Sequence, residues 1–136
     1  VEGLTLTYAQ GDDNSTDASE ADHTVMKASY AYGPITVGYS ESEYDDEVAA
    51  GDQSTEAYNI AYTISDDLSI SYGSEELEFG VQSASQVAAE FERIKLTYTT
   101  GGMTLTASQS TGDNIDYSTT ATKDQEVWAL GATFAF

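Results

Sequence analysis

Three basic side chains are the positions in this chain where charge could act on a passing solute. The 136 residues include 24 Asp and Glu but only four Lys and Arg, for a formal net charge of −20. Lys27, Arg93 and Lys95 stand at the polar positions of alternating segments, whereas Lys123 stands in a polar stretch. Basic side chains lining a water-filled passage form a positive wall that tunes its selectivity. The alternative is that these cations are merely solvated, or are paired with Glu92 or Glu126.

The carboxylates give a weaker indication of a binding site than the basic side chains do. Asp12, Asp13, Asp45 and Asp46 form acidic runs whose oxygens suit Ca²⁺ or Mg²⁺, but no run has the spacing of a dedicated calcium loop. We therefore expect no cofactor and no fixed metal, and at most loose divalent binding. His23 is the only His, and no nucleophile elbow or phosphate loop is present, so we expect no enzyme. Such acidity also excludes a nucleic-acid partner.

Alternation of apolar and polar residues predicts the elements that position these side chains. Successive side chains of a β-strand point to opposite faces of its sheet, so a period of two predicts a strand with one apolar and one wettable face. No apolar run approaches the roughly 20 residues of a spanning helix. The chain reads as one all-β unit, residues 1–136, with eight strands near residues 3–10, 24–32, 35–41, 57–65, 67–74, 92–100, 102–109 and 126–136.

Short and long connections alternate strictly between these segments. Tight turns are predicted at 33–34, 65–67 and 100–102, and long polar stretches near 10–23, 41–56, 74–92 and 109–126. The long stretches and their edges hold 21 of the 24 carboxylates, leaving the apolar faces of the predicted strands uncharged. Short turns on one side and long loops on the other are typical of a transmembrane antiparallel up-and-down β-barrel. Tyrosines near the segment ends agree with the aromatic girdles of such barrels.

The C-terminal segment carries the most specific motif. It alternates to the last residue, with Leu130, Ala132, Phe134 and Phe136 on its apolar side. This resembles the final strand of bacterial outer-membrane barrels, which in that family is the signal read by the barrel assembly machinery. The hairpin over 28–39 and the opening over 3–8 resemble Gram-negative general diffusion porins of the alphaproteobacterial type, and the likeness covers nearly the whole chain, as a C-terminal half.

The resemblance implies a homotrimer in the outer membrane that contacts lipid and lipopolysaccharide and passes small hydrophilic solutes and ions. Porins of this family have sixteen strands, so eight would be part of such a barrel. The alternatives are a complete eight-stranded barrel that serves as a scaffold or surface-binding protein without a channel, and a soluble secreted acidic β-sandwich. Small Thr, Ser, Ala and Gly residues on the polar face favour the wide barrel, because a closed eight-stranded interior needs bulk to fill it.

Overall fold

Eight long strands make up most of the described part of the protein. A computed structural model of the chain describes residues 2–13, 20–46, 51–80, 87–117 and 123–135. All eight predicted strands are present. Their bounds are β1 (Leu4–Asp13), β2 (Ala21–Tyr32), β3 (Ile35–Asp46), β4 (Gln53–Ser65), β5 (Leu68–Phe79), β6 (Ala89–Thr100), β7 (Met103–Asp113) and β8 (Gln125–Phe134).

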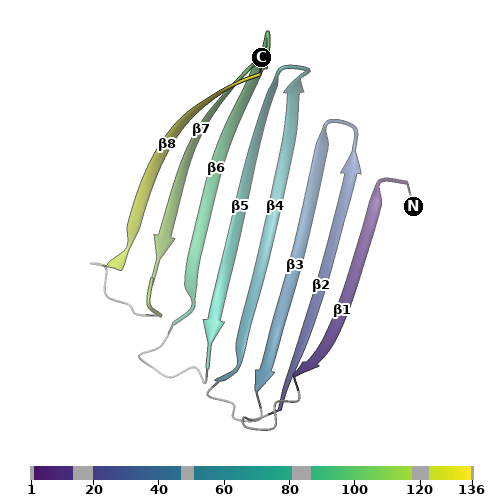
Figure 1. The fold of residues 1–136 in the computed structure, drawn as a ribbon, viewed down its shortest axis with the longest axis vertical. Coiled ribbons are helices and arrows are strands. Elements are labelled where there is room, and N and C mark those ends of the chain that lie inside the picture. Colours follow the sequence, from purple (N-terminus) through teal and green to yellow (C-terminus); the bar gives the residue numbers. More distant parts are fainter. Residues whose placement is uncertain (1, 14–19, 47–50, 81–86, 118–122, 136) are drawn as a thin grey trace.

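The strands form one antiparallel sheet in which each strand pairs only with its neighbours in sequence. The order is β1 to β8 without a crossover, and β1 and β8 are not paired with each other. The predicted antiparallel up-and-down arrangement is therefore confirmed, and the sheet is open. Figure 1 shows the short turns at one end and the long connections at the other. Both ends of the chain lie beside the short turns, since Ala31 N–H donates to Gly3 O at 2.9 Å and Ala135 N–H to Gly102 O at 2.8 Å.

The strand register shows that the strands are tilted relative to the line of short turns. Val37, Ile60, Tyr72, Ile94 and Gln109 are direct partners along one row across β3 to β7. Pro34 and Gly102 mark the short turns before β3 and β7. Val37 is three residues beyond the first turn and Gln109 is seven beyond the second, so the row moves four residues away from the short-turn end over four strand steps. One residue per step, with a rise of about 3.3 Å and a strand spacing of about 4.8 Å, corresponds to a tilt of about 35°. Barrel sheets have a tilt of this size.

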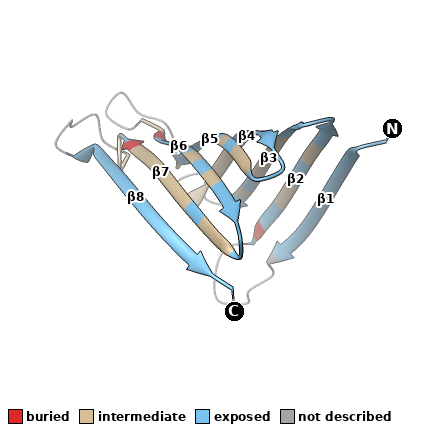
Figure 2. Ribbon diagram, turned by 90° about the horizontal axis from the view of Figure 1, so that it is seen from above, coloured by how far each residue is buried: buried red, intermediate tan, exposed pale blue. Residues whose placement is uncertain are grey.

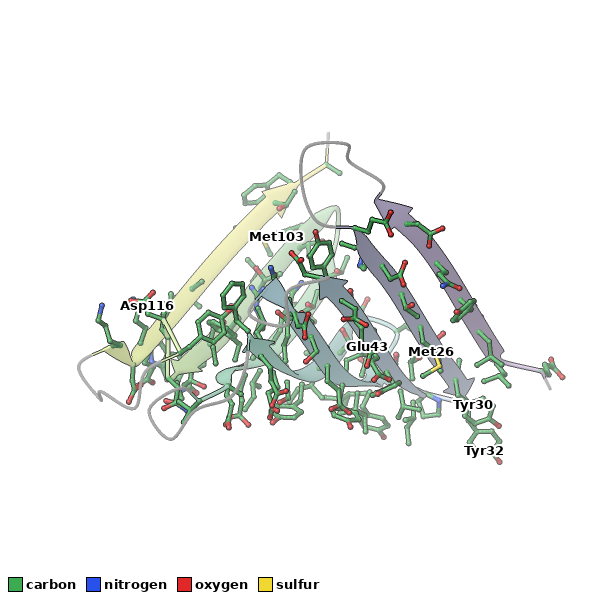
Figure 3. The ribbon with its side chains drawn as sticks, turned by 90° about the horizontal axis from the view of Figure 1, so that it is seen from below. Met26, Tyr30, Tyr32, Glu43, Met103 and Asp116 are labelled. Atoms are coloured by element: carbon green, nitrogen blue, oxygen red, sulfur yellow. The ribbon has the colours of Figure 1, made fainter. Side chains whose placement is uncertain are left out.

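The sheet is a single layer with no hydrophobic core. Among the described residues only Ala21 and Ala89 are buried apolar residues, at 5% and 4% exposure. Figure 2 shows the sheet curved into a trough, with β1 and β8 exposed at its edges. Tyr30 and Tyr32 extend from its convex side in Figure 3, away from the enclosed space. A sheet normally buries one face against a second layer, and the residues that the structure describes form no such layer over either face.

Four glycines at the short-turn end have backbone conformations that other residues rarely adopt, and two of them differ in what surrounds them. Gly3 has φ of +82° and Gly33 has φ of +56°. A Cβ at Gly3 would lie 2.3 Å from the Ala31 carbonyl oxygen, whereas a Cβ at Gly33 would meet nothing within 4 Å. The first position therefore combines backbone strain with a steric clash, and the second has strain alone.

We predict that Gly3→Ala destabilises the folded sheet more than Gly33→Ala does. Left-handed backbone costs an L-residue about 1 to 2 kcal/mol, which is the whole expected effect at Gly33. At Gly3 the β1–β2 contact must also open, so the loss should exceed the Gly33 value by at least about 1 kcal/mol. Urea unfolding of the folded protein measures both losses. Equal losses would contradict the close approach of Gly3 to β2.

Candidate functional site

The convex face carries a continuous apolar band at the short-turn end of the sheet. Directly opposed residues share a face, so the register places the apolar sides of all eight strands together. The band is only five residues long on β3, from Ile35 to Tyr39, and seven on β4, from Tyr58 to Ile64. Its side chains are largely exposed, with Leu6 at 70% and Leu130 at 89%.

Five aromatic residues border this band on the side of the long connections. We call them the aromatic border: Tyr8, Tyr39, Tyr58, Tyr72 and Trp128. Each donates a hydrogen bond away from its ring to a polar side chain beyond the band. Tyr39 Oη bonds Glu41 Oε2 at 2.8 Å, Tyr72 Oη bonds Glu92 Oε1 at 2.6 Å, and Trp128 Nε1 bonds Glu126 Oε1 at 2.9 Å. The other two donate to Glu56 and Gln10. An aromatic residue that is apolar on one side and hydrogen-bonded on the other is suited to a boundary between oil and water.

Beyond the border the convex face becomes strongly acidic. The strands continue past the predicted segments at this end, for example to Asp46 instead of residue 41 and to Phe79 instead of residue 74. Carboxylates that the sequence placed in loops therefore lie on strands. Twelve of them project from the convex face: Asp12, Asp22, Glu41, Glu43, Asp45, Glu56, Glu76, Glu78, Glu90, Glu92, Asp113 and Glu126. We call this set the acidic belt.

Like charges stand directly opposite one another in the acidic belt. Glu41, Glu56, Glu76, Glu90 and Asp113 are successive partners across five strands. Asp22 lies between Asp12 and Asp45 in the same way. Opposed like charges destabilise a sheet. Hydrogen bonding to Asp12, together with its charge, raises the pKa of Asp22 above its usual value near 3.8.

The belt is not organised as a metal centre. Of the predicted divalent ligands, Asp12 and Asp45 share the convex face, Asp46 lies on the concave face, and the side chain of Asp13 lies outside the described part. No three acidic or His side chains in the described residues are arranged to hold a metal ion. The expected loose divalent binding stays a prediction.

The concave face is polar and carries the three candidate cations. Lys27, Arg93 and Lys95 all lie on it, and Glu75 and Asp46 are the carboxylates with described side chains that strands contribute to the same face. Lys27 borders a hollow of about 310 Å³ that Thr7 and Ser40 also line. Arg93 borders a second hollow, of about 430 Å³, over β4 to β7. The sequence therefore placed all three basic side chains on the correct face.

None of these three cations pairs with a carboxylate in the described residues. The one ion pair found there joins Lys123 Nζ to Asp116 Oδ2 at 2.8 Å, and it raises the pKa of Lys123. Arg93 instead donates to Ser108 Oγ at 3.3 Å. Glu92 and Glu126, the alternative partners, point to the convex face and accept bonds from the aromatic border. The described strands therefore form no direct ion pair with these three cations, although Glu75 on β5 borders the same hollow as Arg93.

An apolar cluster on the concave face near the long connections was not predicted. Leu77 and Phe79 on β5 and Phe91 on β6 lie on the polar side of their strands, and Phe91 lines the hollow beside Arg93. The ring of Phe79 lies 5.7 Å from that of Tyr117, and His23 and Tyr44 form a similar contact at 6.4 Å. In the sequence, these apolar residues alternate with carboxylates and occupy the positions that are polar in the first part of each strand. The many carboxylates made the stretch resemble a polar loop. The apolar side of the sheet therefore changes from convex to concave along the strands.

The predicted assembly signal lies at the exposed edge. Leu130, Ala132 and Phe134 of β8 project from the convex face, while Phe136 lies outside the described residues. Leu130 and Ala132 also line an apolar hollow with Leu105 of β7 and Leu96 of β6.

Comparison with known proteins gives no relative. No protein-family model matches the chain, no curated protein matches it, and no solved structure matches it. Within the described ranges, no helix has the length and apolar character needed to cross a membrane.

We predict that Asp22→Asn stabilises the sheet at neutral pH. Because the pKa of Asp22 is raised on folding, the folded state holds its proton more tightly. Stability should therefore fall as pH rises from below 3.8 through the folded-state pKa. The variant should lose this part of the pH dependence and match the parent at about pH 3. Denaturant midpoints across pH measure it. Glu43→Gln is the control, because its opposed neighbours are Thr24 and Ser54. Equal gains in both variants would contradict the Asp12–Asp22 repulsion.

Proposed function

We propose that this chain forms part of the wall of an outer-membrane β-barrel that lets small hydrophilic solutes and ions diffuse passively. The observation that carries the proposal is the division of one sheet into an apolar convex band and, behind it, a polar concave face that carries Lys27, Arg93 and Lys95. A transmembrane barrel needs lipid on its outside and water in its lumen, so its strands alternate in this way. The homotrimer, the contact with lipopolysaccharide and the role of the assembly machinery follow from the resemblance alone.

The aromatic border and the acidic belt also support a convex face directed toward lipid. Aromatic side chains settle at the headgroup level of a bilayer, where one side of the ring is apolar and the other is wet. In this protein the border donates its hydrogen bonds away from the band, toward Glu41, Glu92 and Glu126. Charges at the bilayer centre cost several kcal/mol, and the twelve carboxylates of the belt all lie beyond the border.

The apolar band is thin for this role. Five to seven residues at about 3.3 Å each and a tilt of about 35° span about 14 to 19 Å. The apolar band of outer-membrane barrels is about 25 Å tall. A short band is accommodated when the bilayer thins around it, at a cost that grows with each ångström of mismatch. The proposed barrel should therefore favour a thin bilayer.

We predict that the chain inserts more completely into dilauroyl- than into dioleoyl-phosphatidylcholine vesicles, because the shorter acyl chains match the band. Trp128 is the only Trp and projects from the convex face, so brominated acyl chains should quench its fluorescence. In the control W128F/A129W, the Trp stands at the adjacent position. Its indole then projects from the concave face, and the quenching should be lost. A chain that stays monodisperse without detergent and shows no quenching would contradict the membrane proposal and favour the soluble β-sandwich.

We predict unit conductance steps in planar bilayers whose ion selectivity depends on the concave cations. Replacing Lys27, Arg93 and Lys95 together by Gln should raise the potassium-to-chloride permeability ratio at least about two-fold, because a positive wall repels cations. Reversal potentials in a KCl gradient measure the ratio. Lys123→Gln is the control, because that lysine is paired with Asp116 outside the strands.

Two outcomes contradict parts of this proposal separately. An unchanged permeability ratio in the triple variant would contradict the placement of the three cations along the passage. Insertion without any conductance steps would contradict the pore and favour the alternative of an outer-membrane scaffold.

A further inference from the structure

A hollow on the concave face brings a guanidinium, a carboxylate and an aromatic ring together around a residue without a side chain. Gly73 of β5 lies opposite Asn59 of β4 and opposite Arg93 of β6, in one row across the sheet. Glu75 is the next residue of β5 on the same face, and Phe91 of β6 lies opposite Glu75. All five residues line the hollow of about 430 Å³. The hollow is therefore centred on Gly73, with groups of different chemistry around it.

Gly73 leaves the floor of this hollow open. A Cβ at this position would meet only the carbonyl oxygen of Tyr58 within 4 Å, at an ordinary contact distance of 3.6 Å. Gly73 is not among the residues with positive φ, so its backbone conformation does not require a glycine. Glycine inside a strand weakens the sheet and often marks a place where a ligand or another backbone approaches closely. No other segment of the described chain comes near this Cβ position, so a ligand is the occupant that fits.

The two charged groups beside Gly73 do not neutralise each other. Arg93 and Glu75 are diagonal neighbours on adjacent strands, whose Cα atoms lie about 7 to 8 Å apart. Within the part of the chain that the structure describes, no ion pair joins them. Arg93 instead donates to Ser108 Oγ at 3.3 Å, and Ser108 lies one row closer to the short turns. The guanidinium is therefore directed away from the carboxylate, and a solute over Gly73 meets opposite charges on two of its sides.

The ring of Phe91 gives the hollow one apolar side. Phe91 is 36% exposed although it stands on the polar face of the sheet. A Cβ at Gly112, which opposes Phe91 on β7, would lie 3.1 Å from Cδ1 of the ring and 3.0 Å from Cδ1 of Ile115. The missing side chain of Gly112 thus allows the ring and Ile115 to pack there. The ring is supported from β7, while the hollow extends from it toward β5.

We propose that this hollow binds a zwitterionic α-amino acid with an apolar side chain. The inference rests on the proposed function and deepens it by naming a class of solute. Arg93 binds the carboxylate of the amino acid, because a guanidinium forms strong charge-assisted hydrogen bonds with carboxylates. Glu75 binds the ammonium group, and the ring of Phe91 contacts the apolar side chain. A solute with only one of the two charges leaves a charge of the protein without a partner. The hollow is open to water, so the solute is released readily, as passage through a pore requires.

Titration of leucine into the folded full chain tests the site, with broadening of the ligand NMR signals as the measure of binding. Isocaproate has the same skeleton without the amino group, leucinamide lacks the carboxylate, and glycine lacks the apolar side chain. We expect each of these three to have a dissociation constant at least about five-fold higher than that of leucine, because each loses one contact. Equal binding of leucine and isocaproate would show a simple anion site and overturn the proposal. The absence of saturable leucine binding would also overturn it.

Variants of the chain assign the binding to this hollow. Gly73→Val fills the floor with a side chain suited to a strand, so the sheet should fold at least as well while leucine binding weakens at least about five-fold. Arg93→Gln and Glu75→Gln should each weaken it to a similar extent. Glu76→Gln is the matched control for the carboxylate, because Glu76 is the adjacent residue on the convex face. Lys27→Gln is the control for the cation, because Lys27 lines a different hollow. Leucine binding that is unchanged in Gly73→Val would overturn the proposal.

Conductance in planar bilayers separates this site from the proposed pore. Conductance steps in a protein that does not bind leucine would leave the pore standing and overturn the site. Leucine binding by a protein that gives no conductance steps would support the site and contradict the pore.

Discussion

A single-layer sheet with no core is the constraint on which the rest of this structure depends. Hydrophobic burial is the dominant favourable term in folding, yet the largest apolar side chains of this sheet, such as Leu6, Trp128 and Leu130, are mostly exposed. Backbone pairing between neighbouring strands holds the sheet together, but it leaves the convex band and both edges unsatisfied. In the proposed barrel the acyl-chain phase of a bilayer covers the band, and the aromatic border marks where that phase ends.

Much of this architecture could be predicted from the sequence because alternation is a local signal. The eight strands, their antiparallel order and the faces of Lys27, Arg93 and Lys95 follow from a period of two and from three short turns. The strand ends near the long connections did not follow, because Glu76 and Glu78 have the composition of a loop. Only cross-strand pairing shows that they alternate with Leu77 and Phe79, with the apolar phase reversed. Tilt and edge exposure depend on the register of all the strands and are not local properties.

Net charge alone gives a misleading picture of the concave face. A formal charge of −20 suggests an acidic protein on every surface, but the described strands sort most of their charges by face. The acidic belt lies on the convex side, whereas Lys27, Arg93 and Lys95 lie on the concave side with Glu75 and Asp46. Opposite faces of a pleated strand are separated by the sheet itself, and in salt the interaction between exposed charges is screened beyond about 8 to 10 Å. In the proposed pore, a solute in the trough would therefore lie on the same face as Lys27, Arg93 and Lys95, with the sheet between it and the acidic belt.

Closure of the edges and entry into a bilayer are coupled by the same backbone chemistry. In water, the free N–H and C=O groups of β1 and β8 can bond to solvent, so an open trough is tolerated. In hydrocarbon each unsatisfied group costs several kcal/mol, and the residues of β1 and β8 that lie within the apolar band present such groups at both edges. In the proposed barrel, pairing of these edges with further strands therefore accompanies insertion into the bilayer.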